Sequence, residues 1–209
     1  LTATIFSEFS NGNDSGRDNW VYNFNFDAVK KSAGLFAETY NSEVDRFKRA
    51  GSPEDVDRFV ITDEKKIKWT RNAKRDLRRS KKATFDPALI RAALYHPFSQ
   101  QYLYPGKIYN KEVAQFPRIF PNTESQSENQ VICVPGAGNR KGFGTLATNL
   151  IPTLDVAFEK IQCFPYYIYD EDGSNRRENI TDWALKEFRT HYNDANITKW
   201  DIFHYVDAV

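Results

Sequence analysis

The most regular hydrophobic pattern in the chain lies between residues 27 and 51. Apolar side chains recur there at steps of three and four, which places them on one face of a helix: Val29, Ala33, Phe36, Ala37, Tyr40, Val44 and Phe47. Asp27 is a suitable N-cap for this helix, and Gly51 is suited to end it. The pattern therefore predicts one long amphipathic helix near the N-terminus.

Shorter patterns predict strands and further helices. Aromatic residues alternate with others over 20–26, and short apolar runs at 5–9, 131–134 and 164–169 are also typical of strands. Asp86-Pro87 predicts a helix start with a helix over 88–94, and Thr181 and Thr198 are suitable N-caps for two terminal helices. Helices and short strands are thus mixed without a repeat. We predict an α+β fold with short, largely antiparallel strands flanked by helices.

Positive charge is concentrated in one stretch, residues 65–82. Its basic residues are Lys65, Lys66, Lys68, Arg71, Lys74, Arg75, Arg78, Arg79, Lys81 and Lys82. With one acid, Asp76, the stretch carries +9, whereas the whole chain carries only +1. Thr70 is a candidate N-cap for a helix over 71–81, on which Arg71, Lys74, Arg75, Arg78 and Lys82 share roughly one side.

Such a charge distribution favours a polyanionic partner, of which nucleic acid is the commonest. The alternatives are a solvated helix face or a disordered arm. Apolar residues interleaved with the charges argue against the arm, because they give the segment something to bury: Ile67, Trp69, Ala73 and Leu77.

A glycine-rich loop, Gly136 to Gly144, follows the apolar run at 131–134 and is the one candidate phosphate cradle. A dinucleotide fingerprint needs a third glycine where the chain has Lys141, and a P-loop needs Ser or Thr where it has Gly142. A plain loop between strands is therefore the favoured interpretation. Arg140 and Lys141 at its tip remain candidates for contact with a phosphate backbone.

Signals for catalysis, metal binding and membrane insertion are weak. The three histidines have no nucleophile signature beside them, and no Cys/His cluster indicates a metal site. Cys133 and Cys163 each lie in an apolar run, which predicts free, buried thiols in the reducing cytoplasm. No apolar run approaches the ~20 residues of a membrane helix.

The absence of Met and the apolar C-terminal run, WDIFHYVDAV, indicate a fragment of a larger protein, with the possibility that Met residues are missing from the sequence.

A set of short segments in fixed order resembles a known family. They are NG…GRDNWVYNF at 11–24, ETYN at 38–41, IKWT at 67–70, ALYHPFSQQYLY at 93–104, FPRIFP at 116–121, VICVPGAGNRKGF at 131–143, IQCFPYYIYD at 161–170, ENIT at 178–181 and WDIFHYV at 200–206. The array is similar to the C-terminal specificity region of type ISP restriction–modification enzymes, which are single-chain fusions of nuclease, helicase-like motor and adenine-specific methyltransferase. Two positions depart from the family pattern. Ser15 stands where Thr is usual, and His96 stands where Arg is usual, which puts a DNA role for position 96 in doubt.

The resemblance implies that residues 26–209 are a target recognition domain, truncated at its C-terminus, and that residues 1–25 are a tail from the preceding methyltransferase module. It implies no catalysis by this chain, which lacks the Asn-Pro-Pro-Tyr motif. The parent would be a cytoplasmic, site-specific adenine methyltransferase with helicase and nuclease activity, using S-adenosylmethionine, ATP and Mg²⁺. The implied partners are double-stranded DNA and the methyltransferase and helicase modules of the same chain.

We therefore expect a domain that recognises a DNA sequence and positions duplex DNA for methylation and restriction. The expected DNA-binding residues are Arg17, Lys65, Lys68, Arg71, Lys74, Arg75, Arg78, Arg79, Lys81, Lys82, Arg140 and Lys141. Among these, Arg17 is expected near the target base, with an ion pair to Asp18 as its ordinary alternative. Two other functions remain open: a docking module whose basic face binds an acidic surface of the motor or methyltransferase, and a nucleotide-binding enzyme that uses the glycine loop.

Overall fold

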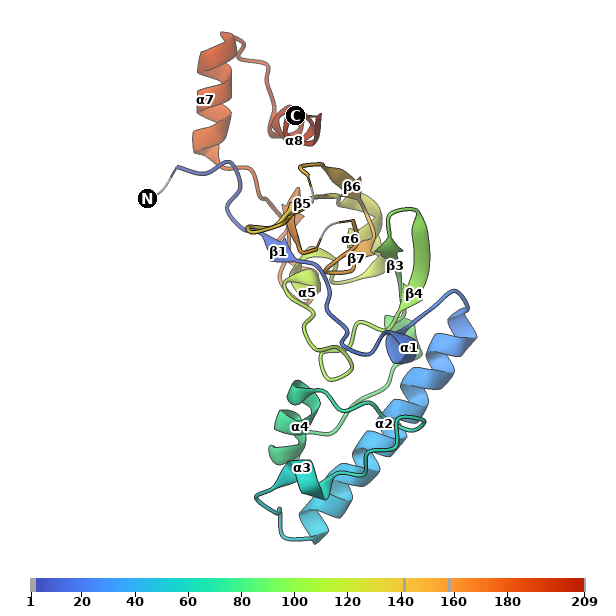
Figure 1. Ribbon diagram of the computed structural model, residues 1–209. Coiled ribbons are helices and arrows are strands. Elements are labelled where there is room, and N and C mark those ends of the chain that lie inside the picture. The colour runs from blue at the N-terminus through green and yellow to red at the C-terminus, as the bar shows by residue number, and fades with distance from the viewer. Residues whose placement is uncertain (1–2, 141, 158, 209) are drawn as a thin grey trace. The chain divides into compact units, whose positions relative to one another are not determined.

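The structure is a computed structural model that describes residues 3–140, 142–157 and 159–208 (Figure 1). The chain divides into two compact units. Unit 1 comprises Leu1–Asn13 and Ala114–Val209, and unit 2 comprises the continuous segment Asp14–Val113. Both units combine helices with short, mostly antiparallel strands, which confirms the predicted α+β class.

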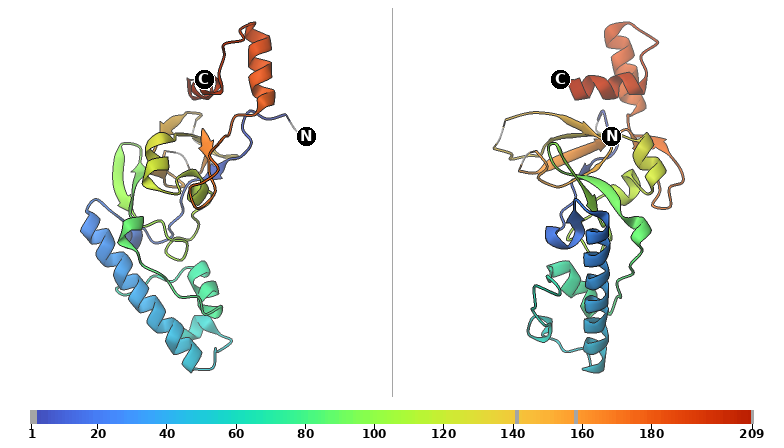
Figure 2. Two further views of the ribbon diagram at one scale, coloured as in Figure 1. Left: turned by 180° about the vertical axis from the view of Figure 1, so that it is seen from behind. Right: turned by 90° about the vertical axis from the view of Figure 1, so that its right-hand side faces the viewer.

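Unit 2 is built around the long helix that the hydrophobic pattern predicts. Its elements are α1 (Asp18–Val21), β2 (Tyr22–Asn23), α2 (Phe26–Arg49), α3 (Val56–Phe59), α4 (Arg71–Arg78), the 3-10 turn η1 (Pro87–Leu89), β3 (Arg91–His96) and β4 (Ser99–Leu103). All seven apolar residues of the predicted face of α2 are buried. Figures 1 and 2 show α3 and α4 lying beside α2.

Helix α2 begins slightly earlier than predicted. The side chain of Asn25 accepts a hydrogen bond from the Ala28 backbone N–H at 3.1 Å, so Asn25 is the N-cap and Asp27 lies inside the first turn. At the other end the predicted glycine is confirmed, because Gly51 has a φ of +74° directly after the C-cap Ala50.

Two predicted elements of unit 2 are wrong. Residues 20–26 do not form one strand: α1 ends at Val21, and only Tyr22–Asn23 pairs with β4. The predicted helix over 88–94 is instead a 3-10 turn followed by β3. The physical reason is tertiary pairing, because β3 forms a hairpin with β4 that buries Ala93 and Leu94 and overrides their helix propensity.

Unit 1 contains a four-stranded antiparallel sheet in the order β1-β8-β5-β6. Its elements are β1 (Ser10–Asn11), α5 (Phe116–Ile119), α6 (Thr123–Glu128), β5 (Val131–Pro135), β6 (Leu146–Thr148), β7 (Ile151–Pro152), β8 (Ile161–Pro165), β9 (Tyr167–Ile168), β10 (Arg177–Glu178), α7 (Asp182–Tyr192) and α8 (Lys199–Ala208). The predicted strand over 5–9 is wrong, because Phe6 forms only an isolated bridge with Ile180.

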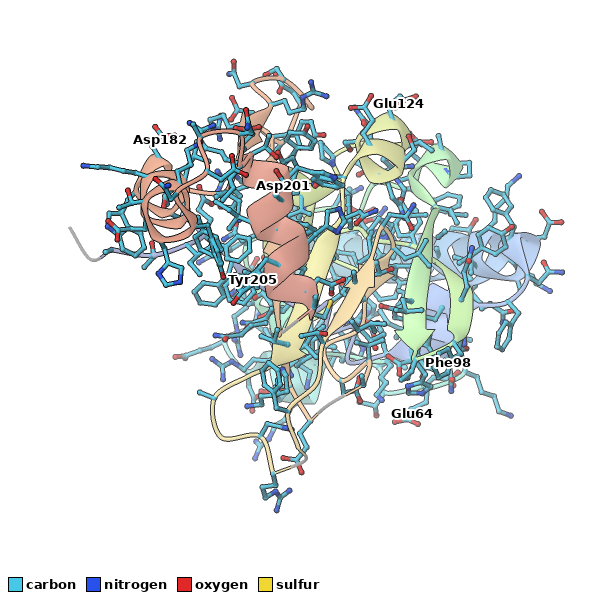
Figure 3. All side chains as sticks on the ribbon, turned by 90° about the horizontal axis from the view of Figure 1, so that it is seen from above. Glu64, Phe98, Glu124, Asp182, Asp201 and Tyr205 are labelled. Carbon is cyan, nitrogen blue, oxygen red and sulfur yellow. The ribbon has the colours of Figure 1, made fainter. Side chains whose placement is uncertain are left out.

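Helices α7 and α8 begin after Thr181 and Thr198, and both threonines accept N-terminal N–H groups as predicted. The helices pack on β5 through a core of Ile132, Tyr166, Ile180, Ala184, Ile202 and Phe203. An ion pair of 2.7 Å joins Lys199 to Asp182 at the start of α7, and Tyr205 of α8 lies 5.4 Å from the Phe188 ring (Figure 3). The C-terminal part of unit 1 is thus tied together by apolar packing and charge.

The two cysteines are free and buried, as predicted. Cys133 of β5 and Cys163 of β8 are direct neighbours across the sheet, with their sulfur atoms 3.8 Å apart. Burial raises the pKa of the Cys163 thiol well above its usual value. Both side chains therefore act as small apolar core residues.

Candidate nucleic-acid interface

The basic stretch, residues 65–82, folds into a loop followed by α4, and its apolar residues hold it in place. Ile67, Ala73 and Leu77 are buried in unit 2, so the segment is packed and is not a free arm. Thr70 is the N-cap, as predicted, and accepts the Ala73 N–H at 3.2 Å. The helix ends at Arg78 and not near residue 81, because Ser80 adopts a left-handed φ of +54°.

Six of the ten cations in this stretch have acidic partners inside unit 2, and one of them is Lys66, whose Nζ atom lies 4.0 Å from Asp63 Oδ2. Asp57 binds Lys74 directly and lies 4.0 Å from Arg78, while Asp45 of α2 binds Lys82 at 2.9 Å. The hydrogen bond from Lys74 lowers the pKa of Asp57, and the hydrogen bond from Lys82 lowers the pKa of Asp45.

Asp76 forms ion pairs with two more cations of the stretch. It lies 3.8 Å from Arg75 and 3.9 Å from Lys81. The six paired cations are therefore partly neutralised within the fold. The sequence pattern missed this, because Asp45 and Asp57 lie well upstream of the basic stretch.

Four exposed cations of the expected DNA-binding set have no acidic partner in the part of the chain that the structure describes: Lys65, Lys68, Arg71 and Arg79. Three of them precede or begin α4, where the helix N-terminus adds its own partial positive charge. We refer to these four residues as the open cations. They provide the strongest uncompensated positive charge of the basic stretch.

Arg17 differs from the expectation. Its side chain is only 1 % exposed, so it offers no surface for direct contact with DNA in this structure. Its Nη2 atom donates to Thr70 Oγ1 at 2.5 Å, and its guanidinium lies 4.7 Å from the centre of the Phe36 ring. The ordinary alternative, an ion pair with Asp18, is not formed either, and Asp18 accepts hydrogen bonds from Ser15 and Tyr95 instead.

The Arg17 guanidinium is buried without a full set of partners. Its Nε and Nη1 atoms have no hydrogen-bond acceptor. Burial lowers its pKa to about 10, from an ordinary 12.5. Because its one hydrogen bond goes to the N-cap of α4, Arg17 is placed to hold the start of the basic helix.

The glycine loop lies in unit 1. Arg140 is exposed and forms an ion pair of 2.8 Å with Glu159, whereas Lys141 lies outside the described residues. The loop connects β5 to β6 and not to a helix, so it lacks the strand–loop–helix context of a phosphate cradle. This supports the interpretation as a plain connection.

The described residues also bear on metal binding and membrane insertion. Within the described ranges, no group of three or more His, Cys, Asp or Glu residues is arranged to hold a metal ion. Over the same residues, no helix has the length and apolar character needed to cross a membrane.

Comparison with known structures identifies the relatives of this chain. It resembles the DrdV–DNA complex solved by cryo-electron microscopy, with a TM-score of 0.81, 35% identity and coverage of 97% of this chain and 19% of that one. It also resembles a nuclease-deletion mutant of the Type ISP restriction-modification enzyme LlaGI in complex with a DNA substrate mimic, with a TM-score of 0.79, 30% identity and coverage of 92% and 15%.

A third structure shares the fold at lower identity. The ATP-dependent Type ISP restriction-modification enzyme LlaBIII bound to DNA gives a TM-score of 0.78 at 22% identity, with coverage of 99% of this chain and 13% of that one. The chain thus spans less than one fifth of each of these proteins. No curated protein sequence matches it. The family model described as the Type ISP C-terminal specificity domain matches residues 4–209, and the chain belongs to this family.

Proposed function

We propose that this chain is the DNA sequence recognition domain of a type ISP restriction–modification enzyme. The observation that carries the proposal is the group of open cations, Lys65, Lys68, Arg71 and Arg79, on a packed segment of unit 2. When exposed cations without acidic partners contact phosphates, the counterions condensed on the DNA are released. The free energy of this release supplies much of the affinity for duplex DNA. The DNA in the related DrdV and LlaGI structures supports the same partner.

In this proposal the domain positions duplex DNA and other parts of the parent react with it. Methylation of adenine N6 and restriction would use S-adenosylmethionine, ATP and Mg²⁺ bound outside this chain, in the cytoplasm. The purified chain is then expected to show no methyl transfer to DNA, since its sequence holds no Asn-Pro-Pro-Tyr motif for a flipped adenine. The division between a tail at 1–25 and a recognition domain at 26–209 stays a prediction.

We assign different roles to the open and the paired cations. An open cation should contact phosphate directly, whereas a paired one must first give up its carboxylate, which reduces its net gain. Arg17 would act indirectly, by holding Thr70 and hence the first turn of α4.

The test is a set of DNA-binding isotherms at several salt concentrations. Lys68→Ala and Arg71→Ala should each lower the log–log salt slope by about 0.9 and weaken binding to all duplexes alike. The matched controls are Lys74→Ala and Arg78→Ala, whose side chains share Asp57, and these should change the slope less.

One result favours the competing function, a docking module for the motor or methyltransferase. If the wild-type chain fails to bind duplex DNA even at low salt, the open cations serve an acidic protein surface instead. The proposal would also be contradicted if DNA binding did not depend on salt and the Lys68→Ala and Arg71→Ala variants bound DNA as tightly as the wild type. The DNA would then lie away from the open cations.

A further inference from the structure

The tip of the β3–β4 hairpin in unit 2 presents a bulky aromatic side chain entirely to solvent. Pro97 and Phe98 connect the two strands, and Phe98 is 103 % exposed. Figure 3 labels it at the end of the pale green strand pair. Of the aromatic side chains that the structure describes, it is the most exposed.

The backbone at this position is also unfavourable for phenylalanine. Phe98 has a φ of +77°, in the left-handed region that suits glycine or asparagine. Of the described residues with a positive φ, it is the only aromatic one. An exposed phenyl ring in a strained conformation brings the isolated fold no packing energy, and strain of this kind concentrates at functional positions.

The rest of the hairpin holds this tip firmly. Leu103 is buried at its base, opposite Arg91, and Leu94 is buried nearer the tip, opposite Gln100. The strand register shifts between Leu94 and His96, and the hydroxyl of the intervening Tyr95 donates to Asp18 Oδ2 at 2.8 Å. A bulge of this kind re-aims the residues that follow it. The tip therefore projects from an anchored base.

The side chains beside the ring are suited to base edges. His96 and Ser99 face each other across the hairpin, and His96 and Gln100 are exposed. Residues 91–103 contain no Asp or Glu, so no carboxylate of the hairpin would repel a phosphate. Glutamine pairs well with adenine, and a two-stranded ribbon is narrow enough to enter the major groove of DNA.

We propose that Pro97 and Phe98 form an apolar wedge that inserts between neighbouring base pairs of bound DNA, with His96 and Gln100 directed at the base edges. Minor-groove proteins that kink the duplex use apolar side chains such as Phe and Pro in this way, and the same stacking on bases is open to a ribbon that enters from the major groove. The ring then exchanges full solvent exposure for stacking against bases, which explains why the chain keeps it at a strained position. The proposal rests on the proposed DNA-binding function.

The test compares a perfect duplex with a duplex that carries one central mismatch, each with 2-aminopurine beside the centre. A mismatched step is already partly unstacked, so a wedge binds it more tightly. The wild-type chain should bind the mismatched duplex about 5-fold or more tightly than the perfect one, and 2-aminopurine fluorescence should rise on binding. Phe98→Ala should lose about 10-fold in affinity together with the preference and the fluorescence rise, whereas Phe98→Trp should retain them.

The matched control is Phe24→Ala, because Phe24 is also an exposed aromatic, at 71 %, in the same unit. It should behave as wild type, and all variants should keep the wild-type unfolding midpoint. If Phe98→Ala keeps both affinity and mismatch preference, the wedge is wrong while the DNA-binding function stands. A uniform loss on both duplexes without a fluorescence change also overturns it. If the wild-type chain binds neither duplex, the proposed function itself fails, and the wedge fails with it.

Discussion

The hydrogen bond between Arg17 and Thr70 should make the two side chains strongly interdependent. Thr70 serves two donors, the Ala73 N–H of α4 and the buried Arg17 guanidinium. Removing the hydroxyl by Thr70→Ala loses a helix cap worth ~1 kcal/mol and a charge-assisted hydrogen bond worth ~2 kcal/mol. The expected loss in the free energy of unfolding is therefore about 3 kcal/mol.

The same substitution should cost much less when Arg17 is first replaced by Met. Arg17→Met alone loses the hydrogen bond but also removes the burial of the charge. A pKa lowered from 12.5 to about 10 corresponds to a burial cost of about 3 kcal/mol, so against the hydrogen bond of about 2 kcal/mol the net change should be a gain of about 1 kcal/mol in the free energy of unfolding. In the Met background Thr70→Ala then loses only the cap, about 1 kcal/mol, which leaves a coupling energy of about 2 kcal/mol.

Urea unfolding of the four proteins, followed by tryptophan fluorescence, measures this cycle, since Trp69 directly precedes Thr70. Thr198→Ala is the control, because Thr198 caps α8 through the Asp201 N–H and is exposed, so about 1 kcal/mol is expected in either background. An equal cost of Thr70→Ala with and without Arg17 would refute the reasoning, because it would mean that the buried guanidinium does not depend on the cap.

Three more predictions concern the rest of the chain. Gly12→Ala should destabilise by about 2 kcal/mol or more in thermal unfolding, because a Cβ there would lie 2.5 Å from the Thr153 carbonyl oxygen. Burial raises the pKa of Tyr40 in the folded chain, whereas the pKa of a tyrosine in the unfolded chain is about 10. The free energy of unfolding should therefore keep its neutral-pH value up to about pH 10 and fall above it. Denaturation midpoints across alkaline pH check this, and Tyr40→Phe should weaken the pH dependence. Cys133 and Cys163 should resist Ellman's reagent in the native chain and both react after unfolding, and rapid native labelling would contradict their burial.

Local signals in the sequence were sufficient where an element depends on its own residues. The sequence predicts helix α2 because its apolar spacing and the glycine after it are properties of one continuous segment. Thr70 was predicted as a cap for the same reason. The sequence does not predict strand β3, because its conformation is fixed by pairing with β4. The Ala and Leu residues of this segment favour a helix by themselves and contain no signal of that pairing.

The candidate interface shows the same division. The charge of the basic stretch was visible in the sequence, but its partial neutralisation by Asp45 and Asp57 depends on how α2, α3 and α4 pack. The burial of Arg17 was also invisible, because an arginine in a polar loop is ordinarily exposed or paired with a nearby acid. Contacts between distant segments decided which cations are open.

The path of the chain through unit 2 has a consequence for how such domains can be exchanged. Asp14 and Glu112, near the first and last residues of the unit, exchange two backbone hydrogen bonds of 2.8 Å. A segment whose ends meet in this way has the form of an insertion. It can be replaced as one cassette, carrying α4 and the β3–β4 hairpin together, at the cost of two closely spaced peptide junctions. Recombination at these two points would exchange the whole of unit 2 and leave the residues of unit 1 unchanged.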